Sequence, residues 1–316
     1  MFALALLAGA LRAWALRGML RGDSISYLDI AQAYARGDWA SAISTFWSPL
    51  YPWILALVLR LFHPSPESEY TAVSLLGLVF YFALLLAFLF LWRSLEETAD
   101  SAGKDSKEEP PLATHAIARL VLGYAIFFWG ALQLLRIGPN LADQLLSVFV
   151  VLAAAFLVRL RRPHPRLRDY AALGAVLALG YLAKAVLFPL VPIFLVTAAL
   201  APPPGSRSRR GVVMAAAVFL ALALPWIAVL SRHAGRFTWS DTGPLNYAWI
   251  INRAPMFNWQ GHPPGTGTPV HPTRRIFDVP AAYEFASPVP GTYPYWYDPT
   301  YWNQGLRPHL DVQRTW

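Results

Sequence analysis

Apolar residues along this chain gather into runs that are too long and too uniform for the helices of a soluble domain. Residues 70–92 hold no charged side chain over 23 positions, and a helix needs about 20 apolar residues to cross a bilayer. Comparable runs cover 116–135, 141–158, 170–201 and 212–230. They show neither the polar face of a surface helix nor the alternation of a barrel strand. The pattern predicts an all-α membrane protein.

Composition and charge placement agree with this prediction. Hydrophobic residues make up 56% of the chain and charged residues 14%, against about 25% charged in soluble domains. The formal net charge of +8 would suit nucleic acid, but two arginine clusters stand directly beside apolar runs, as the positive-inside rule requires. No soluble basic domain is left to bind nucleic acid, so we expect a membrane partner and no nucleic acid. The clusters are Arg159, Arg161, Arg162, Arg166 and Arg168, and then Arg207, Arg209 and Arg210.

The two arginine clusters set the topology. With both in the cytoplasm, residues 170–201 have to cross the membrane twice, as two short helices that turn near Lys184. Each would be about 22 Å long, shorter than the hydrocarbon core, so local thinning or shifted helix ends have to absorb the difference.

Counting backwards from this hairpin gives about seven transmembrane helices. Residues 141–158 run inward, 116–135 outward and 70–92 inward, after a first helix at 1–20 that runs outward. Residues 21–69 then form an external, juxtamembrane first loop.

Two parts follow: a transmembrane module at 1–230 and an external tail at 231–316. The tail is rich in Pro, Gly, Trp and Tyr and poor in aliphatic residues, so we expect it to be irregular and without a large core. Its aromatic rings suit stacking on sugars or an interfacial belt. A short apolar stretch at 47–62 is broken by prolines, and we interpret it as a helix lying in the interface.

We expect a multi-pass protein of the bacterial inner (plasma) membrane, with its active site and tail on the periplasmic, external side. The N-terminus allows a second interpretation, because Ala13-Trp14-Ala15 after an apolar stretch resembles a signal-peptide cleavage site. No Lys or Arg precedes that stretch, however, and Arg12 interrupts it, which favours a first transmembrane helix.

Two aspartates are candidates for chemistry at the external face. Asp23 follows the first helix, and Asp143 is the only acid in 141–158. Each has a structural alternative, because Asp is a common helix cap. The topology nevertheless puts both on one side of the membrane at comparable depth. There they could hold a divalent cation, or divide the roles of general base and orienting group.

Two basic residues are expected on the same side. Lys184 lies inside the apolar stretch 170–201, and an ionisable residue in such a place marks function by default because it is costly to bury. At the external turn of a hairpin it could neutralise a lipid phosphate, or simply reach the interface. Arg136 is a second external cation, and its long side chain could likewise simply reach the interface.

The sequence lacks the residues that several other chemistries require. There is no cysteine, which excludes disulfides, zinc thiolates and a cysteine nucleophile. His262, His271 and His309 lack the spacing of metal ligands. The sequence also has no P-loop, dinucleotide fingerprint or G-x-S-x-G motif.

Several short motifs occur in order along residues 1–239. They are Arg12 followed by Asp23-x-x-x-Tyr27, the segment Pro49-Leu50-Tyr51-Pro52, Asp143 at the start of a helix that ends in arginines, the glycine-rich stretch from Gly174 to Lys184, and Leu224-Pro225-Trp226. Together they resemble the polytopic GT-C glycosyltransferases, especially the bacterial members similar to protein O-mannosyltransferases and aminoarabinose transferases.

This resemblance implies an inverting glycosyltransferase. It would move a hexosyl or pentosyl group from a polyprenyl-phosphate donor to a lipid, protein or glycan acceptor on the external face. Asp23 would take the proton from the acceptor hydroxyl, and Asp143 would orient the acceptor or help to bind a metal. Lys184 and Arg136 would bind the donor phosphate, where charge develops in the transition state.

The resemblance also implies that Tyr27 and Tyr51 contact the substrate. Relatives often carry Asp-Glu in the first loop, whereas Ser24 follows Asp23 here. A divalent cation, Mg²⁺ or Mn²⁺, is therefore an open alternative. Relatives usually have further helices, so we expect a chain ending at Trp316 to be C-terminally truncated or a reduced variant.

Two other functions fit the same pattern. A transporter or flippase of lipid-linked sugars would share the helices and the buried lysine, but it should show repeated halves and broken helices at mid-membrane. No such repeat is visible in the sequence. A non-catalytic membrane protein that binds sugars or assists assembly would instead depend on the aromatic tail.

Overall fold

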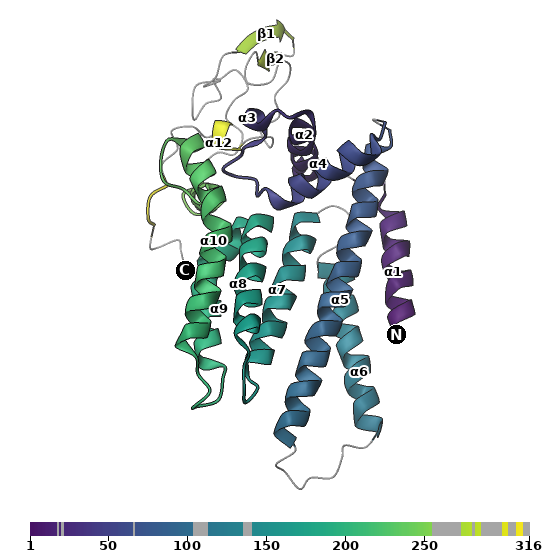
Figure 1. The fold of residues 1–316 in the computed structure, drawn as a ribbon. Helices are drawn as coiled ribbons and strands as arrows, with labels where there is room; N and C mark the ends of the chain where they lie inside the picture. Colours follow the sequence, from purple (N-terminus) through teal and green to yellow (C-terminus); the bar gives the residue numbers. More distant parts are fainter. Residues whose placement is uncertain are drawn as a thin grey trace.

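Long helices run side by side, and a second group of helices lies across one end of them (Figure 1). The structure is a computed structural model. It describes residues 1–17, 19, 22–65, 67–103, 113–134, 141–254, 273–279, 282–285, 299–302 and 308–311.

Within the described ranges, three helices are long and apolar enough to cross a membrane. Shorter apolar helices accompany them, and a glycine-rich helix lies in the middle of the bundle. The long helices are α5 (Glu69–Gly103), α7 (Leu141–Leu160) and α10 (Arg209–Ala234). The others are α1 (Phe2–Ala15), α6 (Ala113–Phe128) continued by the π-helix η1 (Trp129–Leu134), α8 (Leu167–Ala183), the 3₁₀ helix η2 (Ala185–Leu190) and α9 (Val191–Leu200).

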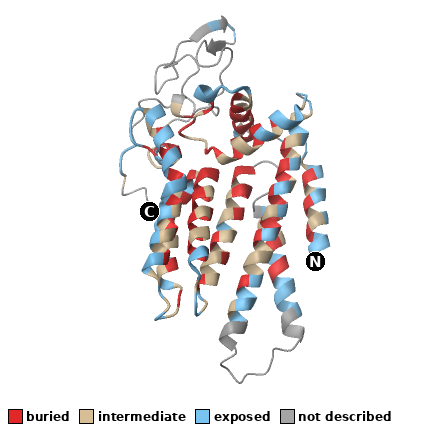
Figure 2. Ribbon diagram, in the orientation of Figure 1, coloured by how far each residue is buried: buried red, intermediate tan, exposed pale blue. Residues whose placement is uncertain are grey.

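The outer faces of these helices are apolar. Figure 2 shows exposed residues along the outside of the bundle, and many are large hydrophobic side chains, such as Val79 on α5, Ile193 on α9 and Val213 on α10, each more than half exposed. Soluble proteins rarely expose apolar surface on this scale, whereas lipid tails solvate it. The fold is that of a helical membrane protein.

The centre of the bundle is packed through small residues. Helix α7 lies between α5 and α8, and α8 packs against α10. A Cβ built on Gly174 of α8 would stand 2.2 Å from the backbone oxygen of Ala215 on α10, so the two backbones touch here. In lipid the hydrophobic effect does not drive helices together, so their association depends on close packing, which small residues at the interface allow.

The chain reverses at Lys184, where the sequence predicts a hairpin. Helix α8 ends at Ala183, and Lys184 has an extended backbone (φ −157°, ψ 125°). The next residue, Ala185, donates its N–H to the hydroxyl of Ser48 at 2.9 Å, so a side chain from another segment satisfies this backbone group at the break. The chain then returns as η2 and α9.

Three helices form the layer across the end of the bundle: α2 (Gly22–Arg36), α3 (Trp39–Ala42) and α4 (Leu50–Phe62). Helix α4 runs obliquely over the bundle in Figure 1, and it begins at Leu50, since residues 43–49 form a loop. Tyr27 of α2 and Tyr51 of α4 join the hydrophobic core that fixes this layer.

The tail departs from the expected irregular segment. It contains helix α11 (Thr242–Ile250), the strands β1 (Thr273–Phe277) and β2 (Ala282–Phe285), and the single turn α12 (Pro299–Trp302). The two strands pair antiparallel, so the otherwise helical chain carries one small β-hairpin among its described residues. Most of the aromatic stretch at 291–302 lies outside the described residues.

An ion-pair cluster joins the helices at the end opposite α2. The Arg159 side chain donates to the buried carboxylate of Asp169 at 3.2 Å, and Arg162 pairs with Glu97 of α5. These contacts connect α5, α7 and the start of α8, where the chain leaves the apolar part of the bundle.

We predict that Gly174→Ala destabilises the protein by about 1–3 kcal/mol, because the added methyl group overpacks the contact with Ala215. The loss should appear although Ala is the better helix former. The measurement is the unfolding of detergent-solubilised protein. Gly243→Ala is the control, since a Cβ there meets nothing within 4 Å. Equal stability of the two variants would contradict the close approach of α8 and α10.

Candidate functional site

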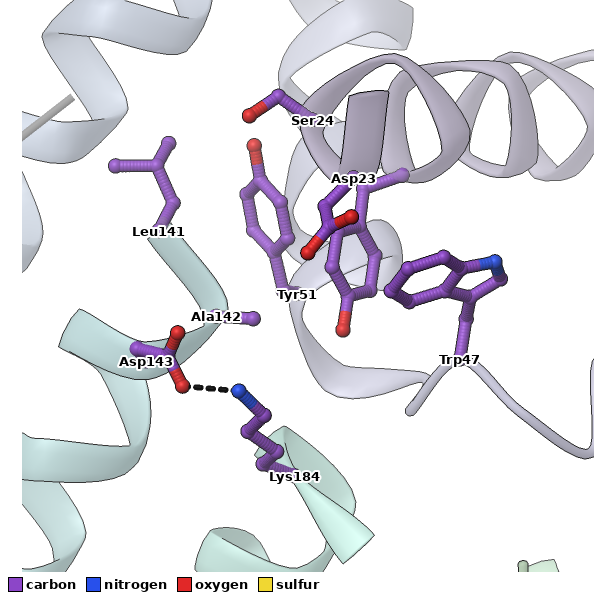
Figure 3. Close-up of a pocket in the computed structure, with 9 residues that line it drawn as sticks. Asp23, Ser24, Trp47, Tyr51, Leu141, Ala142, Asp143 and Lys184 are labelled. Carbon is purple, nitrogen blue, oxygen red and sulfur yellow. Dashed lines mark hydrogen bonds and ion pairs between the residues drawn. The ribbon is translucent and has the colours of Figure 1, made fainter. Parts of the chain in front are cut away.

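A pocket opens between the α2 layer and the ends of α7 and α8 (Figure 3). It encloses about 310 Å³ of empty space, which includes its mouth to solvent. Its lining combines two acids, one base and three aromatic rings from four separate segments. The lining residues are Asp23, Ser24, Tyr27, Trp47, Tyr51, Leu141, Ala142, Asp143 and Lys184.

Asp23 stands in the first turn of α2. The helix as the structure describes it begins at Gly22, one residue before Asp23. A carboxylate in the first turn is favoured by the helix dipole. The side chain is exposed, and its carboxylate points toward the same space as Asp143 and Lys184 in Figure 3.

Asp143 and Lys184 form an ion pair across this space. Asp143 stands in the first turn of α7, and Lys184 follows the last residue of α8. Both side chains are 36% exposed. Pairs with this much contact with water contribute little to stability, at most about 1 kcal/mol, so an anionic ligand can replace Asp143 as the partner of Lys184 at small cost.

Tyr27 and Tyr51 supply hydroxyl groups to the pocket. Their rings meet edge to face at 5.0 Å. Burial, followed by the charges of Asp23 and Asp143, raises the pKa of Tyr27 above its ordinary value, so this hydroxyl stays protonated at neutral pH. The Tyr51 hydroxyl is buried and has no partner among the described residues. A buried hydroxyl without a partner is rare in folded proteins, and in Figure 3 this one points toward Ser24 and away from the ion pair.

The loop 43–49, which carries Trp47, is held from two sides. Within the loop, the hydroxyl of Ser44 accepts the N–H of Trp47 at 3.1 Å. From beyond α10, Ser240 donates its hydroxyl to the carbonyl of Thr45 at 3.1 Å, and Thr242 donates to that of Phe46 at 2.6 Å. These bonds fix one wall of the pocket to residues almost 200 positions away in the sequence.

A second, smaller cavity lies on the other side of this loop. It encloses about 180 Å³ and shares Trp47 with the first pocket. Tyr181, Trp226 and Trp239 line it, and the Tyr181 hydroxyl donates to the carbonyl of Trp239 at 2.8 Å. Several aromatic rings line the cavity. Ser48 and Ala185 also line it, and Ala185 directly follows Lys184 of the ion pair in the sequence.

Five of the six site residues predicted from the sequence therefore line one pocket. The sixth, Arg136, lies outside the described residues. The sequence pattern assigns no role to Ser24, which lies within Asp23-x-x-x-Tyr27, or to Trp47, which begins the apolar stretch 47–62. Leu141 and Ala142 carry no sequence signal, because they line the pocket only by preceding Asp143 on α7.

The pocket carries an excess of one formal negative charge, since Asp23 and Asp143 face a single ammonium group. No group of three or more His, Asp or Glu residues that could hold a metal occurs in the described part of the chain. Two carboxylates suit Mg²⁺ or Mn²⁺ only if substrate oxygens and water complete the coordination, as is common for Mg²⁺.

Comparisons of the chain with protein-family models, with curated proteins and with solved structures gave no match.

A further carboxyl group with unusual titration lies on α2 outside the pocket lining. Burial, and then the charge of Glu69, raise the pKa of Asp29 from 3.8 to about 6, against a smaller opposing effect of Arg36. Glu69 itself accepts two bonds from the amide of Gln32, at 2.9 and 3.1 Å. This cluster attaches α2 to the start of α5.

The raised pKa predicts a pH effect on stability. The folded state holds the Asp29 proton more tightly than the unfolded state, so this contribution is complete below pH 3.8 and is lost as the pH rises through about 6. Asp29→Asn should remove that loss and unfold at a higher temperature than wild type above pH 6. The measurement is the unfolding temperature against pH. Asp38→Asn, at the exposed cap of α3, should keep the loss of stability between pH 3.8 and about 6, and persistence of that loss in Asp29→Asn would contradict the assignment.

Proposed function

We propose that this chain is an inverting membrane glycosyltransferase of the GT-C type that uses a polyprenyl-phosphate sugar donor. The observation that carries the proposal is the single pocket lined by Asp23, Asp143 and Lys184. It combines a carboxylate able to accept a proton, a cation able to bind phosphate, and aromatic rings able to contact a sugar.

The proposal includes seven crossings, with the pocket on the periplasmic side of the bacterial inner membrane. In Figure 1 successive helices of the bundle run in opposite directions, and the turns that carry the arginine clusters lie at the end away from α2. By the positive-inside rule that end faces the cytoplasm. Several of the proposed spans, such as α1 with 14 residues, are shorter than the hydrocarbon core and require local thinning.

In the proposed reaction the acceptor hydroxyl lies beside Asp23. Its oxygen attacks the anomeric carbon from the face opposite the donor phosphate, and its proton passes to the Asp23 carboxylate. The bond between the anomeric carbon and the phosphate oxygen breaks with inversion, and the electron pair stays on that oxygen. Lys184 stabilises the charge that develops there. The hydroxyls of Tyr27 and Tyr51 orient the substrate.

Asp143 has two states in this scheme. Without ligand it pairs with Lys184. When the donor binds, its phosphate replaces Asp143 as the partner of the Lys184 ammonium group. Asp143 is then free to orient the acceptor. Because phosphate entry adds negative charge to a pocket that already has an excess of it, a divalent cation held by Asp23 or Asp143 together with the phosphate would relieve the repulsion.

We predict that Asp23→Asn lowers sugar transfer by about a hundredfold to ten-thousandfold, the usual contribution of a general base. The assay uses the full chain in proteoliposomes with a panel of polyprenyl-phosphate sugars. Asp29→Asn is the matched control, since it is the same change on the same helix but outside the pocket lining.

Donor flipping measured in the same vesicles separates the enzyme from a transporter. An enzyme loses transfer in Asp23→Asn, whereas a flippase moves the donor equally well in wild type and variant and transfers nothing. Wild-type rates of transfer in Asp23→Asn would contradict the assignment of the general base.

Lys184→Met should lower transfer by about a hundredfold to a thousandfold, because it removes the cation at the leaving phosphate. Its unfolding temperature should change little, since the ion pair with Asp143 is partly exposed. Lys184→Arg keeps the charge and should recover part of the activity. Equal activity of the Met and Arg variants would show that the charge has no role in transfer.

A further inference from the structure

Two turns meet at the end of the bundle opposite the pocket. One connects α7 to α8 and the other connects α9 to α10, and they lie next to each other in Figure 1. The hydroxyl of Ser206 donates to the carbonyl of Pro163, which joins the turns directly.

These turns are strongly basic. Residues 159–169 and 207–210 together hold eight arginines and one acid, Asp169. Arg159 binds Asp169 and places its guanidinium over the ring of Phe90, and Arg162 binds Glu97. The neighbouring carboxylates Asp169 and Glu97 are thus engaged by the two arginines closest to the bundle.

The other six arginines are exposed, and within the described residues none forms an ion pair with a carboxylate. They come from both turns, and we call them the basic edge. The basic edge consists of Arg161, Arg166, Arg168, Arg207, Arg209 and Arg210.

Exposed apolar side chains border the basic edge on the bundle side. Leu167 stands between two of its arginines, Leu200 ends α9, and Val213 lies in the first turns of α10. These side chains are 49%, 59% and 66% exposed. A band that changes from apolar to cationic over a few residues is the pattern expected at the boundary between lipid tails and headgroups.

We propose that the basic edge binds the phosphate groups of anionic phospholipids in the leaflet that borders it. The planar guanidinium group binds phosphate through two parallel hydrogen bonds, and arginines on two joined turns can engage more than one headgroup at a time. Bound lipid would then hold the α7–α8 and α9–α10 hairpins together from the membrane side. This inference depends on the chain being a membrane protein and not on the proposed reaction.

The test compares two double variants of the full chain in neutral detergent. Arg166→Gln/Arg207→Gln removes one arginine from each turn. Arg60→Gln/Arg253→Gln is the matched control, since it removes two exposed arginines that lie on α4 and just after α11, outside both turns. Each protein is titrated with short-chain phosphatidylglycerol or phosphatidylcholine, and bound lipid is measured by native mass spectrometry.

We expect wild type and control to bind phosphatidylglycerol more tightly than phosphatidylcholine. The basic-edge variant should bind phosphatidylglycerol roughly 25-fold more weakly, at about fivefold per arginine. The unfolding temperature without added lipid verifies that both variants are folded.

Three results would overturn the proposal. They are equal affinity of wild type for the two lipids, an equal loss of phosphatidylglycerol binding in both variants, and displacement of the lipid by glycerol phosphate or a short oligonucleotide at similar concentration. The last result would assign the basic edge to soluble anions or to nucleic acid.

Discussion

The chain reverses at one charged residue, and the candidate site depends on this reversal. Lys184 lies within a stretch of 32 residues, 170–201, that is otherwise almost entirely apolar, and an ammonium group is costly in hydrocarbon. The chain resolves this by ending α8 immediately before Lys184 and returning as η2 and α9, so that the charge comes to the end of the bundle. There Asp143 neutralises it, and the loop 43–49 satisfies the backbone at the break through Ser48. The pocket, the hairpin and the layer of α2 and α4 all meet at this point.

Much of the fold could be predicted because membrane helices leave strong local signals. The apolar runs gave α5, α7 and α10 within a few residues of their observed starts, and the break near Lys184 followed from the arginine clusters on either side. The structure of the tail was harder to predict. Its helix α11 and the strands β1 and β2 carry no long periodic pattern, since short elements depend on contacts with distant residues more than on their own sequence.

The candidate site was predictable residue by residue but not as an assembly. Asp23 and Asp143 were identified as acids at the external ends of apolar segments and Lys184 as an ionisable residue inside one, and the count of crossings put them on one face. Their common pocket depends on how α2 folds back over the ends of α7 and α8, which no local pattern encodes. Trp47 shows the same limit, because its place in the wall depends on hydrogen bonds from Ser240 and Thr242.

Those last bonds have a consequence for the order in which the site is built. A chain made from its N-terminus exposes the loop 43–49 almost 200 residues before Ser240 and Thr242, so this wall of the pocket is fastened only after the sequence of α1 to α10 has been made. The site is therefore completed late, although most of its lining residues come from the first half of the chain.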